Sequence, residues 1–172
     1  MIELERTYLA KYLPMGLENC DRREVVDIYI PKSDAHPKLR IRKNGDKLEM
    51  TKKEPIETGD ASRQSEQTIV LTEAEFETLN GLDGKRVRKL RYFYKIDDRT
   101  AEIDIFKDFL EGLVLVDFEF DSLQEKEKFI MPDFCLVEVT QETFAAGGML
   151  CGKDYKDIEE DLKRFGYQKI IS

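Results

Sequence analysis

The sequence predicts an α+β protein built on an antiparallel sheet with a few helices beside it. Three observations support this prediction. Most of the chain consists of short segments in which apolar and polar residues alternate, the pattern of half-buried strands. Turn residues separate these segments, and the stretch KNGDK at 43–47 contains the Asn-Gly pair typical of a tight β-hairpin. Only a few stretches have helical spacing, so strands dominate the expected architecture.

Nine segments have the composition and alternation of strands. They are residues 2–9, 24–30, 38–43, 47–53, 65–70, 87–96, 101–106, 113–120 and 136–140. Helices are expected after Thr72 and Ser122, because each is followed three residues later by a glutamate, the spacing of a capping box. A third helix is expected between Asp154 and Gly166, with one apolar stripe that should pack against the outside of the sheet. The stripe consists of Tyr155, Ile158, Leu162 and Phe165.

The length and the net charge of the chain exclude several classes of protein. A chain of 172 residues is expected to form a single domain, residues 1–172. The net charge of −8 argues against binding to nucleic acid or to anionic membranes, which depend on excess Lys and Arg. The sequence has no apolar run of the ~20 residues that a membrane span requires, and no signal-peptide pattern, so a cytoplasmic location is expected. Three cysteines without CxxC spacing argue against a disulfide framework and against a zinc site.

The strand segments carry charges of one sign at positions i and i+2. Successive side chains of a strand point to opposite faces, so each such pair lies on one face of the sheet. Neighbouring like charges repel, and the face therefore needs charges of the opposite sign close by. The acidic pairs are Glu3/Glu5, Glu102/Asp104 and Asp117/Glu119; the basic residues are Arg40/Arg42, Lys89/Arg91 and Lys53.

Two interpretations of the charged face are open. In the first, the face meets water and opposite charges pair across strands. In the second, the sheet closes with its charges inside and its apolar face outside, which encloses a polar tunnel. Buried acids and bases together need an occupant that is anionic and accompanied by cations. A polyphosphate with divalent metal ions has both properties, since Arg and Lys bind phosphate oxygens and carboxylates bind the metal.

In their order along the chain, these strands resemble the motifs of the CYTH, or triphosphate tunnel metalloenzyme, superfamily, and within it the bacterial inorganic triphosphatases. IELER is similar to the opening E-x-E-x-K motif of the family. LRIR, MTKK, RKLRY, AEIDIF and LVDFEF are similar to its later R-x-R, T-x-K, K-x-R, E-x-D-x-F and E-x-E strands. The resemblance covers most of residues 1–140. It implies a closed eight-stranded antiparallel β-barrel with helices packed outside.

The resemblance also implies a role for each charged residue. A divalent ion, Mg²⁺ or Mn²⁺, would be held by Glu3, Glu5, Asp117 and Glu119. Phosphate oxygens would be bound by Arg40, Arg42, Lys53, Lys89 and Arg91. The residues expected to act in catalysis are Glu102, Asp104 and Lys53, the two acids by holding or orienting a second ion with the attacking water. For Asp104 in particular, a structural ion pair with a neighbouring arginine is an open alternative.

The function that the resemblance implies is metal-dependent hydrolysis of a linear triphosphate, either inorganic tripolyphosphate or a similar organic triphosphate, with release of phosphate. Two departures leave alternatives open. Thr7 stands where the family usually has a lysine, and FAAGGMLCG at 144–152 stands where bacterial triphosphatases often have polar residues. The alternatives are a non-catalytic polyphosphate or nucleotide binder and a class IV-type adenylate cyclase. The apolar strand LVLVDFEF also leaves open whether helices cover it or a second copy of the chain, as in a homodimer.

Overall fold

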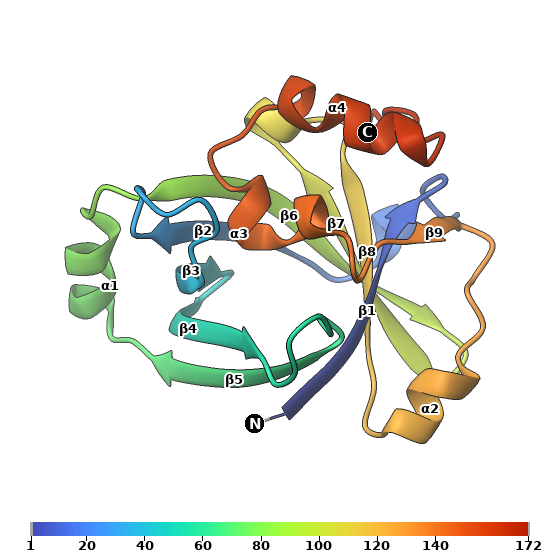
Figure 1. Cartoon of the computed structure of the whole chain (residues 1–172), viewed down its shortest axis with the longest axis horizontal. Helices are drawn as coiled ribbons and strands as arrows, with labels where there is room; N and C mark the ends of the chain where they lie inside the picture. The colour runs from blue at the N-terminus through green and yellow to red at the C-terminus, as the bar shows by residue number, and fades with distance from the viewer. Residues whose placement is uncertain (1, 172) are drawn as a thin grey trace.

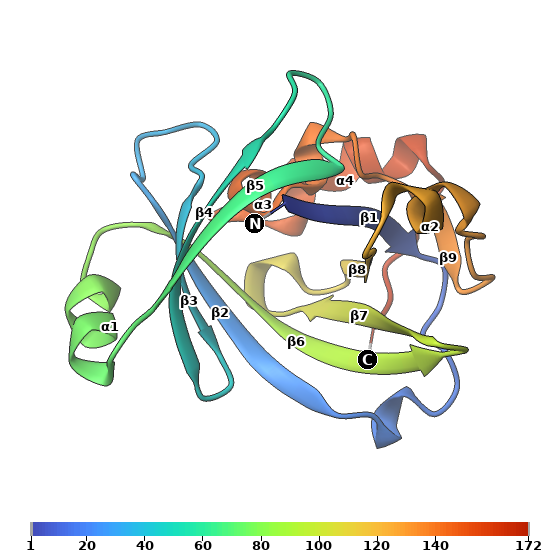
Figure 2. The same ribbon diagram turned by 90° about the horizontal axis from the view of Figure 1, so that it is seen from below.

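The computed structural model describes residues 2–171, which wrap an antiparallel sheet into a barrel (Figures 1 and 2). All nine predicted segments are strands, although several begin or end two residues away from the expected position. The strands are β1 (Ile2–Ala10), β2 (Arg22–Ile30), β3 (Leu39–Asn44), β4 (Lys47–Pro55), β5 (Arg63–Val70), β6 (Lys85–Ile96), β7 (Arg99–Phe106), β8 (Val114–Glu119) and β9 (Cys135–Glu138). The β3–β4 connection is the predicted hairpin, with Gly45 at a φ of 58°.

Strand β1 closes the barrel. The strands follow the order β5-β4-β3-β2-β6-β7-β8-β1, and the start of β1 pairs again with β5, where Ile2 lies opposite Ser65. Farther along, β1 leaves β5 and pairs with β9 instead, with a shift of register between Leu9 and Ala10. Eight strands therefore form the predicted closed barrel, and β9 extends the sheet from the second half of β1.

Helices begin at each of the three predicted caps, and one further short helix is present. They are α1 (Glu73–Asn80), α2 (Leu123–Lys128), α3 (Gly147–Leu150) and α4 (Tyr155–Arg164). Thr72 and Asp154 each form a capping box, while Ser122 accepts a hydrogen bond from the backbone of Glu125. The four-residue helix α3 was not predicted, because one helical turn is too short to show periodicity. In the described part of the chain, no helix is long and apolar enough to cross a membrane.

The outer face of β1, β7 and β8 is apolar and buried. Tyr8, Ile103 and Phe118 lie on this face, and their relative exposure is at most 1%. Residues from connecting segments cover it, among them Leu17 and Phe134, which belong to the same apolar cluster. Because side chains alternate along a strand, burial of this face points the intervening charged residues into the barrel.

Helix α4 packs against the part of the barrel where the inward-facing side chains are apolar. Its residues Ile158 and Leu162 share an apolar cluster with Val87, Phe106 and Leu115. The last three residues also line the barrel cavity, each two positions from a charged inward-facing residue. Figure 1 shows α4 at the top of the view, away from β4 and β5. The predicted stripe of α4 therefore seals part of one end of the barrel, whereas the sequence analysis had placed it against the outside of the sheet.

This packing predicts that Ile158→Ala destabilises the protein. Ile158 is fully buried, so its truncation should lower the free energy of unfolding by about 3 kcal/mol, the usual cost of such a cavity. Denaturant titration would measure the loss. Lys156→Ala, at an exposed position of the same helix, is the control and should change stability little. Equal losses for the two variants would show that α4 does not depend on this contact.

Candidate functional site

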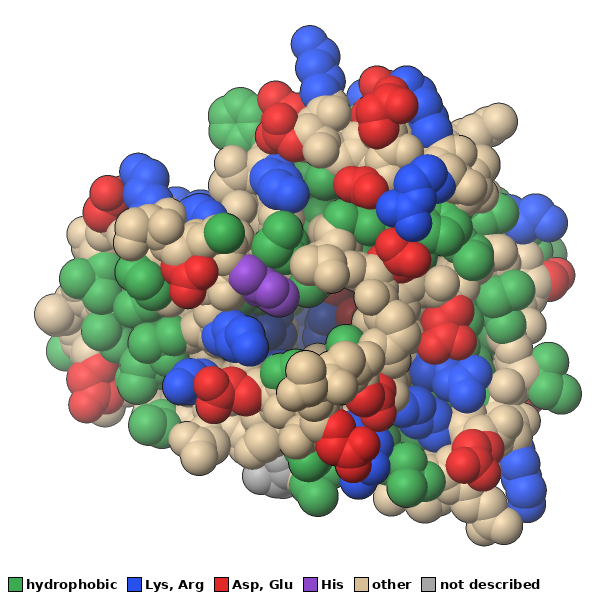
Figure 3. Space-filling view, viewed as in Figure 1, with side chains coloured by type: hydrophobic (Ala, Val, Ile, Leu, Met, Phe, Trp, Pro, Cys, Tyr) green, Lys and Arg blue, Asp and Glu red, His purple; other side chains and the backbone are tan. Residues whose placement is uncertain are grey.

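A cavity of about 570 Å³ occupies the interior of the barrel. Figure 3 shows it as a hollow with basic side chains at its edge and floor. Every charged residue selected from the sequence lines this cavity, which supports the tunnel and argues against a solvated outer face. These residues are Glu3, Glu5, Arg40, Arg42, Lys53, Lys89, Arg91, Glu102, Asp104, Asp117 and Glu119.

Charges of opposite sign are concentrated on different parts of the barrel wall. The three consecutive strands β7, β8 and β1 carry the acidic pairs, whereas β6, β3 and β4 carry the basic residues. Within the acidic part, Glu5 lies directly opposite Glu119 and Glu102 lies opposite Asp117. Like charges in directly opposed positions of a sheet repel each other. We call β7, β8 and β1 the acidic arc. The basic residues that could neutralise its inward-facing acids lie on other strands.

Lys53 supplies the positive charge that Glu3 and Glu5 require. It extends from β4, and its Nζ forms an ion pair with Glu3 and lies 3.9 Å from Glu5 Oε2. Its Nζ also lies 3.2 Å from Oε2 of Glu66, which is directly opposite on β5. Burial opposes the charged form of Lys53, but Glu5 and Glu3 outweigh it and raise the pKa of the lysine. The sequence predicted the need for this charge and left its source open.

Asp27 is a site residue that the sequence analysis missed. It lies on β2 opposite Arg42, whose Nε and Nη2 donate to its two oxygens at 2.7 and 2.8 Å. Although burial opposes ionisation, Arg42 lowers the pKa of Asp27 to about 2. One signal was present: Asp27 is the single acid inside the apolar run VVDIYI, and a carboxylate buried in such a strand requires a partner.

Asp104 forms a second buried ion pair of the same kind. Arg91 donates from Nε and Nη2 to its two oxygens, both at 2.7 Å, and Lys89 also forms an ion pair with it. Despite complete burial, Arg91 and Lys89 hold the pKa of Asp104 well below its usual range. These contacts are those of a structural ion pair, which was one of the two roles that the sequence left open for Asp104. Asp104 thus positions Arg91 and Lys89 within the wall.

Arg40 is the basic residue with the weakest acidic partner. Its neighbours across β2 and β4 are the uncharged Tyr29 and Thr51, whereas Arg42 faces Asp27. Arg40 Nε is buried, forms no hydrogen bond among the described residues, and lies 4.0 Å from Asp27 Oδ1. A buried donor without an acceptor destabilises the folded state, so an anion that enters the cavity would be stabilised by a hydrogen bond from Arg40.

Apart from Asp104, the acids of the acidic arc are more accessible than the two paired aspartates, Asp27 and Asp104. The side chains of Glu3, Glu5 and Asp117 are 17%, 19% and 20% exposed, against 2% for Asp27 and 1% for Asp104. Burial raises the pKa of Glu5 to about 7; Lys53 opposes this rise and the neighbouring acids add to it. Burial likewise raises the pKa of Asp117, together with the charge of Asp104. The acidic arc therefore carries more negative charge than its protein partners neutralise.

This excess charge fits a bound divalent cation. Among residues 2–171, no three carboxylate, imidazole or thiol groups form a ready-made metal cage. The available donors are nevertheless carboxylate oxygens, the ligands that hard cations such as Mg²⁺ and Mn²⁺ prefer. Glu3, Glu5, Asp117 and Glu119 lie on neighbouring strands that face one cavity, and Lys53 is the cation that now pairs with the two glutamates of β1. Their chemistry thus fits a divalent ion.

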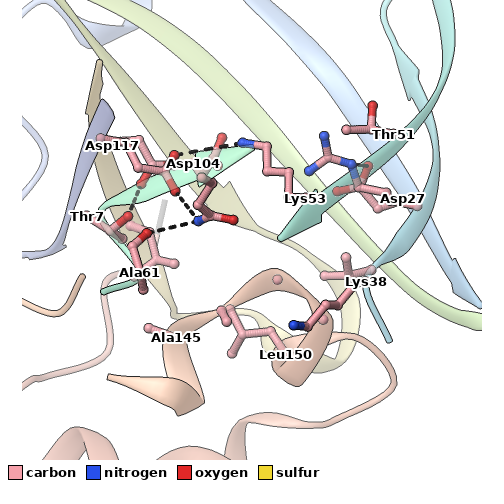
Figure 4. A pocket seen from close by; sticks show the side chains of 18 of the residues that line it. Thr7, Asp27, Lys38, Thr51, Lys53, Ala61, Asp104, Asp117, Ala145 and Leu150 are labelled. Carbon is pink, nitrogen blue, oxygen red and sulfur yellow. Dashed lines mark hydrogen bonds and ion pairs between the residues drawn. The ribbon is translucent and has the colours of Figure 1, made fainter. Parts of the chain in front are cut away.

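The two departures from the family pattern both lie at this cavity. The Thr7 hydroxyl donates to Asp117 at 2.7 Å, so a neutral group occupies the place of the usual lysine. Figure 4 shows Thr7 and Asp117 together, with Ala145 and Leu150 on a neighbouring wall. The segment 144–152 approaches β2 closely, because a Cβ on Gly147 would overlap the Tyr29 hydroxyl. Gly147 thus packs tightly against β2 at this wall of the cavity.

Comparison with known proteins identifies the family. No protein-family model matches the chain. An inorganic triphosphatase of Nitrosomonas europaea is 34% identical over 145 residues, which cover 83% of this chain and 91% of that protein. The chain belongs to the CYTH, or triphosphate tunnel metalloenzyme, superfamily. A crystal structure of an inorganic triphosphatase matches this CYTH fold with a TM-score of 0.63 and 28% identity, covering 88% of this chain and 95% of that one.

A more distant structure shares the CYTH fold. A putative adenylate cyclase of Bacillus halodurans matches with a TM-score of 0.55, covering 99% of this chain and 92% of that one. Its sequence identity is 15%, so the likeness concerns the barrel and not the chemistry.

The raised pKa of Glu5 predicts that the metal-free protein loses stability as the pH rises. A glutamate usually titrates near 4.5, and Glu5 titrates at about 7 in the fold. Between these values the folded state binds the extra proton, so the free energy of unfolding falls with increasing pH. Glu5→Gln should remove about 3 kcal/mol of this fall, measured by urea denaturation from pH 4.5 to 8. A variant profile as steep as that of the wild type would contradict the assignment.

The buried pair of Asp27 and Arg42 predicts a large effect of Asp27→Ala. The variant leaves the Arg42 guanidinium buried without its partner, which should lower the free energy of unfolding by about 3 kcal/mol. Thermal and urea denaturation would measure the change. Asp46→Ala, at an exposed position of the β3–β4 turn, is the matched control and should be nearly neutral. A neutral Asp27→Ala would mean that Arg42 does not need this carboxylate.

Proposed function

We propose that this protein hydrolyses a linear triphosphate, inorganic tripolyphosphate or a similar organic triphosphate, and releases phosphate with the aid of Mg²⁺ or Mn²⁺. The observation that carries the proposal is the cavity wall, on which an acidic arc and a set of basic residues face the same space. Phosphate oxygens suit the basic residues, and divalent ions can join the phosphates to the acids. The name of the relative from Nitrosomonas europaea, inorganic triphosphatase, supports the same chemistry.

The basic residues have distinct tasks in this proposal. Arg40, which has a buried unpaired donor, is the first contact for the phosphate chain. Arg42, Lys89 and Arg91 are already oriented by Asp27 and Asp104, so they can stabilise charge on the phosphate without rearranging. Preorganised charges of this kind contribute strongly to phosphoryl transfer. Lys53 completes the set from β4.

The acidic residues bind the metal and orient water. Glu3, Glu5, Asp117 and Glu119 would hold the divalent ion. When bound, the ion supplies positive charge to the phosphate chain and lowers the pKa of nearby water. Glu102 is the more accessible acid of β7, and we assign it to orient the attacking water. Asp104 acts on the same side of the cavity through its contacts with Arg91 and Lys89.

One observation favours an alternative function. Thr7 places a neutral hydroxyl beside Asp117, so one phosphate-binding cation expected in the family is absent. A protein that binds polyphosphate or nucleotide without turnover would tolerate this loss. No contact of the described residues favours a class IV-type adenylate cyclase, which would form cyclic AMP from ATP.

The decisive experiment measures phosphate release from tripolyphosphate with Mg²⁺, with Mn²⁺ and with chelator. We expect metal-dependent release and a fall in kcat of at least about a hundredfold in Glu5→Gln and in Lys53→Ala, because each removes a charge facing the phosphate chain. Lys52→Ala is the matched control. Lys52 precedes Lys53 on the opposite face of β4, where its 51% exposed side chain pairs with Glu54, so its loss should leave kcat unchanged.

Three other outcomes would contradict the proposed function or support an alternative one. Full activity in Glu5→Gln and Lys53→Ala would exclude the tunnel as the site of hydrolysis. Tight tripolyphosphate binding without phosphate release under either metal would identify the non-catalytic binder. Cyclic AMP formed from ATP, detected by chromatography, would identify the cyclase.

A further inference from the structure

We propose that Lys53 is a built-in counter-ion that a divalent cation displaces, so that metal binding frees the lysine ammonium for the triphosphate. This inference rests on the proposed function, because it concerns the same cavity. It adds a physical link between two ligands: the metal binds where the lysine now lies, and the lysine then binds the substrate. The link makes Lys53 a coupling element as well as a phosphate contact.

The contacts of Lys53 place its charge within the expected metal site. Its Nζ pairs with Glu3 and lies 3.9 Å from Glu5 Oε2, and both acids belong to the proposed metal ligands. Oxygen atoms already paired with an ammonium are less available to a second cation, and two cations in one small space repel each other. Lys53 and a divalent ion therefore compete for Glu3 and Glu5.

The position of Lys53 allows it to move. Its flexible four-carbon chain extends from β4 past β5 to reach β1, and its side chain is 23% exposed. Glu66, directly opposite on β5, offers a second anchor 3.2 Å from Nζ that lies outside the metal ligands. The lysine can thus leave Glu3 and Glu5 without losing every acidic partner. By contrast, Arg42 and Arg91 are each fixed by two hydrogen bonds to a fully buried aspartate.

The displaced ammonium needs a new anion, and the triphosphate provides one. Metal binding then increases the affinity for triphosphate by a route beyond direct metal–phosphate contact. Because coupling between two ligands is reciprocal, triphosphate must increase the affinity for metal by the same factor. Without triphosphate, the lysine returns to the acids and weakens metal binding.

Binding of Mn²⁺ alone tests this inference. Free Mn²⁺ would be counted by electron paramagnetic resonance at pH 8, above the pKa of about 7 of Glu5, with no phosphate compound present. Lys53→Met removes the charge and keeps a chain of similar length. It should bind Mn²⁺ at least about tenfold more tightly than the wild type, since a like charge leaves the site. Lys52→Met removes an equal charge from the outer face and should leave Mn²⁺ affinity unchanged.

Several results would overturn the inference. They are equal or weaker Mn²⁺ binding by Lys53→Met, equal tightening by Lys52→Met, and the lack of Mn²⁺ binding by both the wild type and Lys53→Met. A wild type that binds Mn²⁺ and releases no phosphate from tripolyphosphate contradicts the proposed function only. The two failures are therefore distinguishable.

A second measurement uses the unchanged protein, in case Lys53→Met fails to fold. Acetic anhydride labels accessible lysine amines, and tandem mass spectrometry separates the modification of Lys53 from that of Lys52. Saturating Mg²⁺ should increase the labelling rate of Lys53 severalfold, because the ion releases its amine from Glu3 and Glu5. The labelling rate of Lys52 should stay constant. An unchanged rate at Lys53 would overturn the inference.

Discussion

The structure depends on how a closed barrel accommodates charged side chains that point inward. A buried charge without a partner is strongly unfavourable, so each inward-facing acid or base needs a counter-ion, water or a ligand. The chain meets this constraint in two ways. Asp27 and Asp104 are fully buried and each fixes an arginine from the next strand with two hydrogen bonds. The other acids of β7, β8 and β1 instead face one another and share Lys53 and Arg91 as cationic partners.

These two solutions divide the cavity into a fixed part and an exchangeable part. In the fixed part, Arg42 and Arg91 are each oriented by two hydrogen bonds to a buried aspartate. In the exchangeable part, Glu5 has a raised pKa and Lys53 lies between several acids. Fixed cations suit the stabilisation of charge during phosphoryl transfer, and incompletely neutralised acids suit the binding of a metal that must enter and leave. Both properties follow from which strands are neighbours.

Much of the fold was predictable because the local sequence of a strand determines which side chains lie on each of its faces. Alternation along segments such as LVDFEF assigned Asp117 and Glu119 to one face and Phe118 to the other, and the structure confirms this division. Asp27 was missed because it forms no same-sign pair; its importance arises from Arg42 on the adjacent strand. The structural ion pair of Asp104 was only one of two alternatives, since its choice depends on Arg91 and Lys89 reaching it together.

By itself, the sequence determined the strands, their inward and outward faces and the charged lining, because a period of two residues fixes side-chain direction in any strand. The tertiary structure decided which charges meet. Closure through β1 and β5 brought Lys53 to Glu3 and Glu5, although about fifty residues separate them along the chain. It also placed the apolar stripe of α4 at one end of the barrel. Electrostatic pairing acts over a few ångströms in space, so it depends on strand order and register, which alternation within one strand does not specify.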